Sequence, residues 1–376
     1  MVAGNSGAYA AWGHIAADKR TRNDVALVRS FGRLDDGTRV RACRLGDDDG
    51  LQAEILDLGG ILARLEIPVE GNRVGLVLGL PDAGAYRADP AYLGILVGRY
   101  GNRIAASRFS LDGREYRLAA NEGRNHLHGG MLGFGRRMWT IGSHANDALV
   151  LRYRSPDGEE GYPGTLDATA TYRLQGMRLQ LRFEARCDAP TPFNPTHHPY
   201  FNLAGNPAVP AASQWLRVPA DGYLPIDAEL LPTGEMADVT GTPFDFRQAT
   251  TLAARHDEAD AQLRVGGGYD HCLVLRQPHD RAAELYSPHS GVAMRILCDA
   301  PALQLYGGHG LDVQHPQLGR GLCLEPQDFP DAPNHANFPD AILRPGQHYR
   351  REIEYVFALP GRDREWTEVT AALDRA

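Results

Sequence analysis

The stretch MRLQLRFEA, Met177 to Ala185, alternates charged or amide side chains with leucine and phenylalanine. Successive side chains of an extended strand point to opposite faces of a sheet, so this pattern predicts a strand with one wet face and one dry face. The same alternation recurs along the chain in LQAEILDLGGILARLEI (51–67), ALVLRYRS (148–155), LDATATYRL (166–174) and HYRREIEYVFAL (348–359). Strands of this kind pack one face on a core and expose the other, as in antiparallel sheets.

Turn residues separate these short strands at close intervals, because the chain contains 42 glycines and 25 prolines. The segment SLDGREYRL, Ser110 to Leu118, predicts a hairpin, since Asp-Gly suits a two-residue turn. Amphipathic helical periodicity is rare; the candidates are Gln248–His256 and WTEVTAALDRA at the C-terminus. No GxGxxG follows a strand, which argues against a dinucleotide-binding domain. The sequence therefore predicts an all-β protein, a large antiparallel sandwich or barrel.

One domain over residues 27–359 fits this pattern best, with an N-terminal extension (1–26) and a C-terminal tail (360–376). The formal net charge of -8, with no Lys/Arg-rich run, argues against nucleic acid as a partner. No apolar stretch approaches the ~20 residues that a membrane helix needs. The five cysteines are odd in number and lack CxxC spacing, so we expect free thiols in a reducing, cytoplasmic compartment.

Six segments break the alternation by placing polar residues beside glycines and aromatic residues. Glycine at such places indicates a close approach of the backbone to a ligand or a tight turn. We expect these segments to converge on one pocket. They are residues 98–109, 121–130, 194–205 (NPTHHPYFNLAG), 266–275, 302–310 and 322–339.

Three kinds of chemistry are weighed for this pocket. A metal site could draw on His126, His128, His197, His198 and His271 with Asp270 or Glu325, but their spacing matches no strong signature. Covalent catalysis has little support, because no GxSxG is present and no cysteine lies in a recognisable catalytic context, and no Walker-type loop is present for phosphoryl transfer. Acid–base chemistry needs only one acid and one base, for which His197 or His198 and Glu325 are the natural candidates.

Taken in chain order, the motifs resemble those of the aldose 1-epimerases, also called galactose mutarotases. The resemblance covers about residues 27–359. The matching blocks are GRYGNRI, NHLHGG, SPDGEEGYPG, THHPYFNLAG, YLPIDAELLPTGE, GTPFDFR, GYDHCLVL, LQLYGGH, LCLEPQDFPDAPN and LRPGQHY.

This resemblance implies a large β-sandwich of the galactose-mutarotase type that interconverts the α and β anomers of free aldoses. It implies a monosaccharide as the partner, no cofactor and no metal, and it leaves a monomer and a homodimer both open. The acid falls on His198 and the base on Glu325. The residues that hold sugar hydroxyls fall on Asn102, Arg103, His128, Asp270 and Gln304, and Tyr200, Phe201 and Tyr306 are candidates for an apolar face beside the sugar.

Three departures from the family pattern bear on the preferred aldose. His197 stands where many relatives carry asparagine, and it either supports the strand or tunes His198. His126 and the run LYGGHG also differ, and both are candidates for the wall of the sugar cleft. Three alternatives remain open: a non-catalytic carbohydrate-binding protein on the same fold, a metal-dependent sugar isomerase, and a hexose-6-phosphate epimerase with Arg136 or Arg137 at the cleft mouth.

Overall fold

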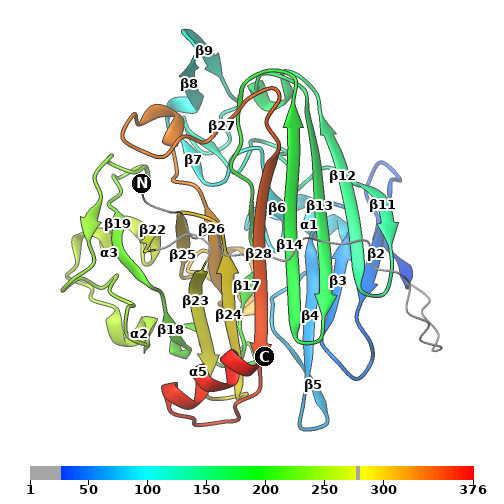
Figure 1. The fold of residues 1–376 in the computed structure, drawn as a ribbon, viewed down its shortest axis with the longest axis vertical. Helices are drawn as coiled ribbons and strands as arrows, with labels where there is room; N and C mark the ends of the chain where they lie inside the picture. The colour runs from blue at the N-terminus through cyan, green and yellow to red at the C-terminus, as the bar shows by residue number, and fades with distance from the viewer. Residues whose placement is uncertain (1–26, 277–279) are drawn as a thin grey trace, which may run out of the picture.

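The computed structural model describes residues 27–276 and 280–376, which form three antiparallel sheets joined by long loops and a few short helices (Figure 1). The nine-stranded sheet contains the alternating stretch at residues 177–185. Its strand β14 buries every second side chain, as the alternation predicts. In spatial order the sheet runs β11 (Thr140–His144), β12 (Ala148–Ser155), β13 (Leu166–Gln175), β14 (Arg178–Cys187), β28 (Tyr349–Ala358), β24 (Val292–Cys298), β23 (Asp280–Ser287), β18 (Trp215–Arg217) and β21 (Thr250–Thr251).

Two further sheets lie across the core from it. The five-stranded sheet follows chain order: β1 (Val28–Arg33), β2 (Arg39–Leu45), β3 (Gln52–Leu56), β4 (Leu62–Val69) and β5 (Asn72–Gly75). The six-stranded sheet runs β17 (Tyr200–Phe201), β26 (Leu322–Gln327), β25 (Ala302–Tyr306), β22 (Asp270–Leu275), β19 (Ala220–Leu224) and β20 (Ala237–Asp238).

Short ladders and helices complete the fold. The ladders are β6 (Leu96–Val97) with β16 (Thr196–His197), β7 (Arg103–Ile104) with β10 (His126–Leu127), β8 (Arg108–Leu111) with β9 (Arg114–Arg117), and β15 (Thr191–Pro192) with β27 (Ile342–Leu343). The α-helices are α1 (Ala83–Ala88), α2 (Leu252–Arg255), α3 (Ala261–Gly266), α4 (Leu311–Gln314) and α5 (Trp366–Arg375). The 3₁₀ turns are η1 (Ala105–Ser107), η2 (Glu159–Gly161), η3 (Ala211–Ser213), η4 (Pro316–Leu318) and η5 (Ala332–Asn334).

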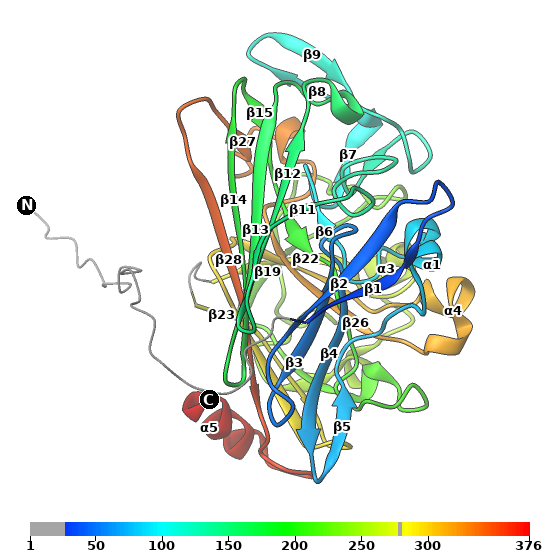
Figure 2. The same ribbon diagram turned by 90° about the vertical axis from the view of Figure 1, so that its right-hand side faces the viewer.

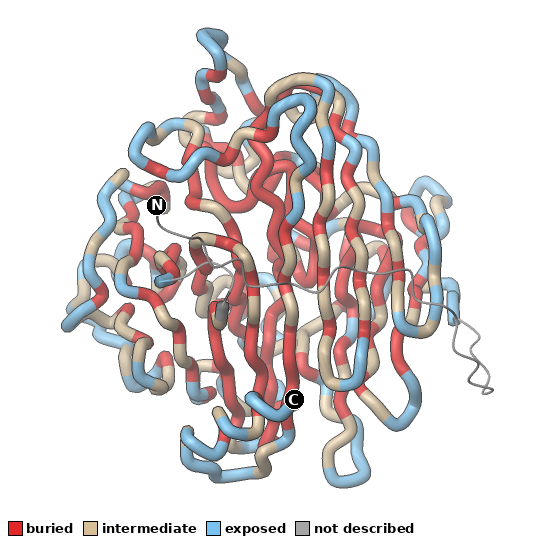
Figure 3. The backbone as a smooth tube through the Cα atoms, in the orientation of Figure 1, coloured by how far each residue is buried: buried red, intermediate tan, exposed pale blue. Residues whose placement is uncertain are grey.

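The main core lies between the nine-stranded sheet and the other two, which makes the architecture a sandwich (Figure 2). One continuous apolar cluster takes Ile55 from β3, Leu181 from β14 and Leu303 from β25. Buried residues occupy the middle of the strands, and exposed residues collect in the loops at their ends (Figure 3). The predicted fold class is therefore confirmed.

Local predictions are confirmed in part. The Asp-Gly hairpin is present, because β8 and β9 pair in register across Asp112 and Gly113. The C-terminal helix is α5, which buries Val369 and Leu373 beside β24 and β28. The segment 248–256, predicted as one helix, is helical only at α2 (Leu252–Arg255), because Thr250 and Thr251 before it form strand β21. No helix within residues 27–276 and 280–376 is long and apolar enough to cross a membrane.

The adjacent histidines point in opposite directions, as successive residues of a strand must. His197 faces the core, where its Nδ1 lies 3.0 Å from the Tyr355 hydroxyl and its Nε2 lies 3.4 Å from the Tyr172 hydroxyl. His198 faces the other way, toward β26. His197 thus supports the packing of β16 on the nine-stranded sheet and does not contact the site described below.

The burial of His197 makes stability depend on pH. Burial lowers its pKa from the usual 6.5 to about 3, so the folded protein keeps this ring neutral while the unfolded chain protonates it below pH ~6.5. The stabilisation is present above that pH and is lost as the pH falls toward 3. We predict that the free energy of unfolding falls more steeply with acid in the wild type than in His197→Asn, by about 1.4 kcal/mol per pH unit between pH ~6 and ~4. Urea unfolding followed by tryptophan fluorescence measures both slopes, and parallel slopes would contradict the assignment.

Candidate active site

An open cleft of about 230 Å³ lies on the face of the six-stranded sheet that is turned away from the main core. Side chains from this sheet form its floor, and loops from other parts of the chain form its walls. The residues that line it are Pro90, Ala91, Tyr92, Asn102, Arg103, Glu122, Leu127, His128, His198, Tyr200, Leu230, Asp270, Tyr306, His309, Gln314 and Glu325.

Strand register places the floor residues in two rows. Asp270, Tyr306 and Cys323 form one row across β22, β25 and β26. Cys272, Gln304 and Glu325 form the next row on the same face, because side chains two residues apart on a strand share a face. The residues that alternate with these along the strands face the main core, as Leu303, Leu305 and Leu324 do. The polar side chains of the floor are therefore held in position by three paired strands of one sheet.

His198 and Glu325 meet at the centre of the cleft. The Nε2 atom of His198 lies 3.6 Å from Oε1 of Glu325. Both side chains are almost completely buried, with 4% and 2% of each residue exposed. The second carboxylate oxygen, Oε2 of Glu325, has no hydrogen-bond partner among the residues that the structure describes. A buried carboxylate oxygen without a partner is costly, which is typical of an atom that meets a ligand.

Burial favours the neutral form of both groups. Desolvation lowers the pKa of His198 to about 4 and raises the pKa of Glu325 well above its usual range. Nearby charges oppose burial at each group: the carboxylates of Asp89 and Asp270 raise the pKa of His198, and Arg103 lowers that of Glu325. Asp270 also adds to the rise at Glu325. In the empty cleft the two groups therefore meet as a neutral pair.

His128 and Asn102 hold each other in the wall above His198. Both have left-handed backbones, with φ of 50° and 62°. The backbone N–H of His128 donates to the Asn102 carbonyl (3.1 Å), and the backbone N–H of Asn102 donates to Nδ1 of His128 (3.2 Å). The ring of His128 then lies edge-on to that of His198, with 5.2 Å between centroids. Left-handed conformations cost energy in residues other than glycine and are common at functional sites.

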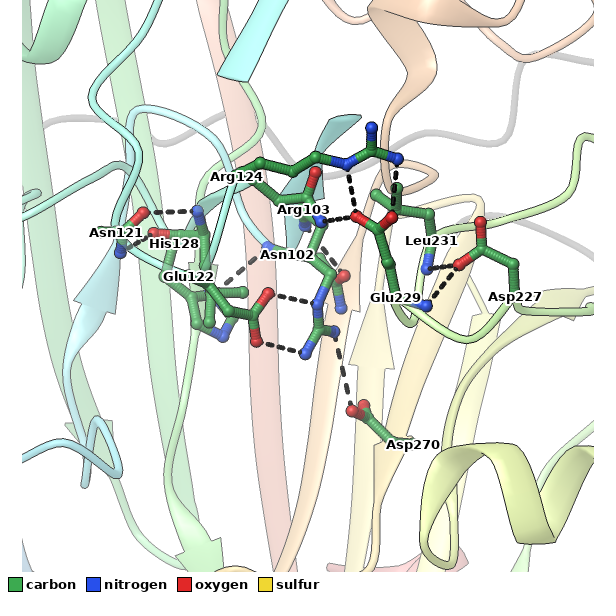
Figure 4. Close-up of polar contacts among 12 residues, drawn as sticks. Asn102, Arg103, Asn121, Glu122, Arg124, His128, Asp227, Glu229, Leu231 and Asp270 are labelled. Carbon is green, nitrogen blue, oxygen red and sulfur yellow. Dashed lines mark hydrogen bonds and ion pairs between the residues drawn. The ribbon is translucent and has the colours of Figure 1, made fainter. Parts of the chain in front are cut away.

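Arg103 is the only lysine or arginine among the described residues that line the cleft, and two carboxylates fix its guanidinium (Figure 4). Its Nε and Nη2 donate to both oxygens of Glu122 at 2.6 and 2.7 Å, and its Nη1 lies 3.7 Å from Asp270. Asp270 in turn accepts a hydrogen bond of 2.6 Å from the amide of Gln304. Charge-assisted bonds of this geometry are strong and directional.

The structure brings six of the seven residues expected from the resemblance directly into the cleft wall: Asn102, Arg103, His128, His198, Asp270 and Glu325. Gln304 lies behind Asp270 in a smaller adjoining cavity. Tyr200 and Tyr306 line the cleft, whereas Phe201 packs in the main core 5.4 Å from the ring of Tyr355.

Two candidate histidines lie elsewhere. The ring of His126 bridges the Ala119 carbonyl and the Tyr162 hydroxyl at 2.7 Å each, so this residue is not part of the cleft wall. His271 alternates with the floor residues of β22, and its Nε2 contacts Gln262. The other departure, LYGGHG, does reach the cleft through Tyr306 and His309.

Sequence reasoning missed several lining residues. Glu122 lies within a polar segment that the sequence singled out, so its position could have been suspected. Gln314 on α4 and Tyr92, whose ring lies 4.8 Å from that of His128, carry no sequence signal of their own.

A metal ion could find ligands at the same place. Candidate ligand atoms of His128, His198 and Glu325 all lie within 4.8 Å of one another. Two histidines and a carboxylate form a donor set that zinc uses in other proteins. The arrangement therefore admits two kinds of chemistry, acid–base transfer or metal binding, and chelation separates them.

Comparisons with known proteins identify the family. A family model described as aldose 1-epimerase matches residues 41–356. Galactose mutarotase from Sus scrofa is 36% identical over 347 residues, which are 89% of this chain and 99% of the relative. Aldose 1-epimerase from Escherichia coli (strain K12) is 37% identical over 336 residues, 86% and 96% of the two chains.

Solved structures give the same result. A homologue of aldose epimerase from C. elegans has a TM-score of 0.79 at 32% identity and covers 85% of this chain and 98% of its own. Galactose 1-epimerase from Lactobacillus acidophilus NCFM has a TM-score of 0.78 at 29% identity, with 89% and 99% covered.

The electrostatics of the cleft predict an unusual titration. Because burial lowers the pKa of His198 to about 4, its ring should remain neutral at pH 6, where an exposed histidine is largely protonated. Histidine-labelled protein titrated by NMR measures this midpoint, and the signal missing from His198→Gln assigns it. A midpoint near 6.5 would show that the ring is solvated and that the cleft is described wrongly.

Proposed function

The chain belongs to the aldose 1-epimerase family, and we propose that it interconverts the α and β anomers of a free aldose with Glu325 as the base and His198 as the acid. The observation that carries the assignment of roles is the contact of these two buried groups at the centre of the cleft. A non-catalytic sugar-binding protein would have no reason to keep both.

The reaction needs a single movable proton on the pair. Glu325 as carboxylate takes the proton of the C1 hydroxyl, while Nε2 of protonated His198 donates to the ring oxygen. The bond between C1 and the ring oxygen breaks, and an open-chain aldehyde results. Rotation about C1–C2 presents the other face of the carbonyl. Reversal of the two transfers then closes the ring to the opposite anomer, with no net gain or loss of protons.

The neutral and the ionic forms of the His198–Glu325 pair hold the same number of protons. In the neutral pair the movable proton is on Glu325; Nε2 of His198 lies 3.6 Å away, and transfer of the proton, once the two atoms approach to hydrogen-bond distance, gives the ionic pair that the reaction uses. Arg103 favours this shift because it stabilises the carboxylate, and Asp89 and Asp270 favour it because they stabilise the imidazolium. The surrounding charges thus offset part of the cost of separating charge in a buried site.

The remaining lining residues suit a polar, neutral ligand. Asp270, Asn102 and the guanidinium of Arg103 offer acceptors and donors to sugar hydroxyls, and Tyr200 and Tyr306 offer aromatic surface to C–H groups. Each of these side chains is held by neighbours before a ligand enters, which reduces the entropy lost on binding.

The charges of the cleft support a free aldose over a sugar phosphate. Arg103, the one arginine among the described residues that line the cleft, already contacts Glu122 and Asp270. Arg136, the candidate for a phosphate contact, donates to the carbonyls of Met131 and Asp89, and Arg137 pairs with Glu159 at 2.8 Å. A dianionic phosphate would meet more negative charge than positive charge here.

The location, the partners, the assembly and the domain boundaries complete the proposal. A cytoplasmic location agrees with the five free cysteines. A monosaccharide is the partner, nucleic acid is not, and the assembly is a monomer or a homodimer. The single domain over residues 27–359 also belongs to the proposal.

Polarimetry on freshly dissolved α-D-glucose and α-D-galactose tests the function. We predict that the wild type accelerates the decay of optical rotation, that EDTA leaves the rate unchanged, and that Glu325→Gln lowers the rate by roughly 10²–10⁴-fold because the base is lost. Glu115→Gln, on the exposed hairpin, serves as the matched control and should behave as wild type. An EDTA-sensitive rate would mean that the histidines and Glu325 bind a catalytic metal. A faster reaction with glucose 6-phosphate than with glucose would instead favour the phosphate epimerase.

The pH dependence of the rate tests the shared proton. Activity is lost when the pair takes up a second proton, as the pH falls toward the His198 pKa of about 4, and again when the movable proton leaves at the raised pKa of Glu325. We predict a kcat/KM plateau that is wider than unperturbed groups would give, because its acid limit follows the lowered pKa of His198 and its alkaline limit follows the raised pKa of Glu325. Asp270→Asn should move the alkaline limb to lower pH, because Asp270 raises the pKa of Glu325. A narrow bell with its two limbs at the ordinary pKa values of glutamate and histidine, ~4.3 and ~6.5, would contradict the shared-proton mechanism.

A further inference from the structure

Strand β26 places two side chains on opposite edges of one imidazole ring. Cys323 and Glu325 are two residues apart and share a face of the strand. The ring of His198 lies between them: Nε2 is 3.6 Å from Oε1 of Glu325, and Nδ1 is 3.6 Å from Sγ of Cys323. Each ring nitrogen therefore has one partner from the same strand.

We propose that Cys323 is a positioning residue for the anomeric reaction, whose thiol accepts a hydrogen bond from Nδ1–H of His198 and so keeps Nε2 as the atom that gains and loses the proton. This inference rests on the proposed function. The nitrogen of a histidine that carries the proton is set by the bond that the other nitrogen makes. With Nδ1–H committed to sulfur, the lone pair of neutral His198 stays on Nε2 and faces Glu325.

The register of the strands keeps the thiol in this place. Cys323 is directly opposite Tyr200 in the β17–β26 pair, and the Tyr200 hydroxyl donates to the Ala91 carbonyl at 2.8 Å. Cys323 is completely buried, and His198 precedes Tyr200 by two residues. The sulfur therefore has little freedom to leave Nδ1, and rotation of the imidazole would break its contacts on both edges.

A thiol suits this position better than a carboxylate does. A carboxylate beside Nδ1 would stabilise the imidazolium strongly and hold the proton on His198. Burial raises the pKa of the Cys323 thiol well above its usual range, so the group stays uncharged. A weak, uncharged acceptor orients the ring without trapping the proton that Nε2 must pass to the sugar.

Substitution of the thiol tests the proposal. In Cys323→Ala the neutral ring is free to carry its proton on Nε2, where it cannot accept the proton of Glu325. We expect kcat to fall about twofold to tenfold, the worth of one hydrogen bond, with KM unchanged because the hydroxyl-binding residues remain in place. Cys323→Ser restores an acceptor and should recover part of kcat. Cys298→Ala, a buried cysteine on β24, is the matched control and should leave kcat unchanged.

NMR of the neutral His198 ring gives a readout that does not depend on activity. We expect the Nδ1–H tautomer in the wild type and a shift toward Nε2–H in Cys323→Ala. An Nε2–H tautomer in the wild type, which needs no variant to fold, would overturn the proposal. So would a Cys323→Ala protein with unchanged tautomer and unchanged kcat. If the wild type fails to accelerate anomerisation, the proposed function fails, while the tautomer measurement still decides the contact.

Discussion

The two-residue period of the six-stranded sheet is the constraint on which the rest of the structure depends. Leu303, Leu305 and Leu324 face the sandwich core, and the side chains between them face the cleft. A slip of one residue in β26 would exchange the faces, so that Glu325 would enter the apolar core and leucine would line the cleft. The burial of the leucines therefore fixes the position of Glu325, the proposed base. The same alternation divides the adjacent histidines between core and cleft, since each must face opposite to its neighbour.

The fixed positions of His198 and Glu325 matter because burial favours their neutral forms, whereas the proposed reaction needs their charged forms. Both His198 and Glu325 are neutral in the empty cleft, whereas the transfer to the ring oxygen requires a charged acid. The surroundings must therefore make charge separation accessible without making it permanent. Arg103 and Asp270 supply opposite charges at a few ångströms, and the uncharged thiol of Cys323 adds orientation without charge. An imidazolium and a carboxylate that rested as an ion pair would stabilise each other, which would make the imidazolium a weaker acid and the carboxylate a weaker base.

Much of this was visible in the sequence, and the limits have a physical origin. Alternation identified β14 and the Asp-Gly hairpin, because strand periodicity and turn chemistry are local properties. The family resemblance indicated the acid and the base. The direction of a given side chain was harder to predict: His126 binds Tyr162 and Phe201 enters the core, since the facing of each depends on register with a distant strand. The helix expected over residues 248–256 is shortened to α2, because Thr250 and Thr251 pair with β18 as strand β21. Contacts such as Cys323 to His198, 125 residues apart, carry no local signal.

The polar network of the floor extends this logic from the acid and base to the sugar. Glu122 holds Arg103, Arg103 approaches Asp270, Asp270 accepts from Gln304, and Gln304 lies across from Glu325 in the β25–β26 ladder. The contacts with Arg103 and Gln304 orient Asp270, so a hydroxyl that binds Asp270 meets a carboxylate that is already in place. Hydrogen bonds made to preorganised groups cost little reorganisation when the substrate moves toward the transition state. In the proposed mechanism the anomeric carbon then reaches Glu325 and His198 in one orientation, because Glu325 and two of the proposed sugar-binding residues, Asp270 and Gln304, stand on neighbouring strands of one sheet.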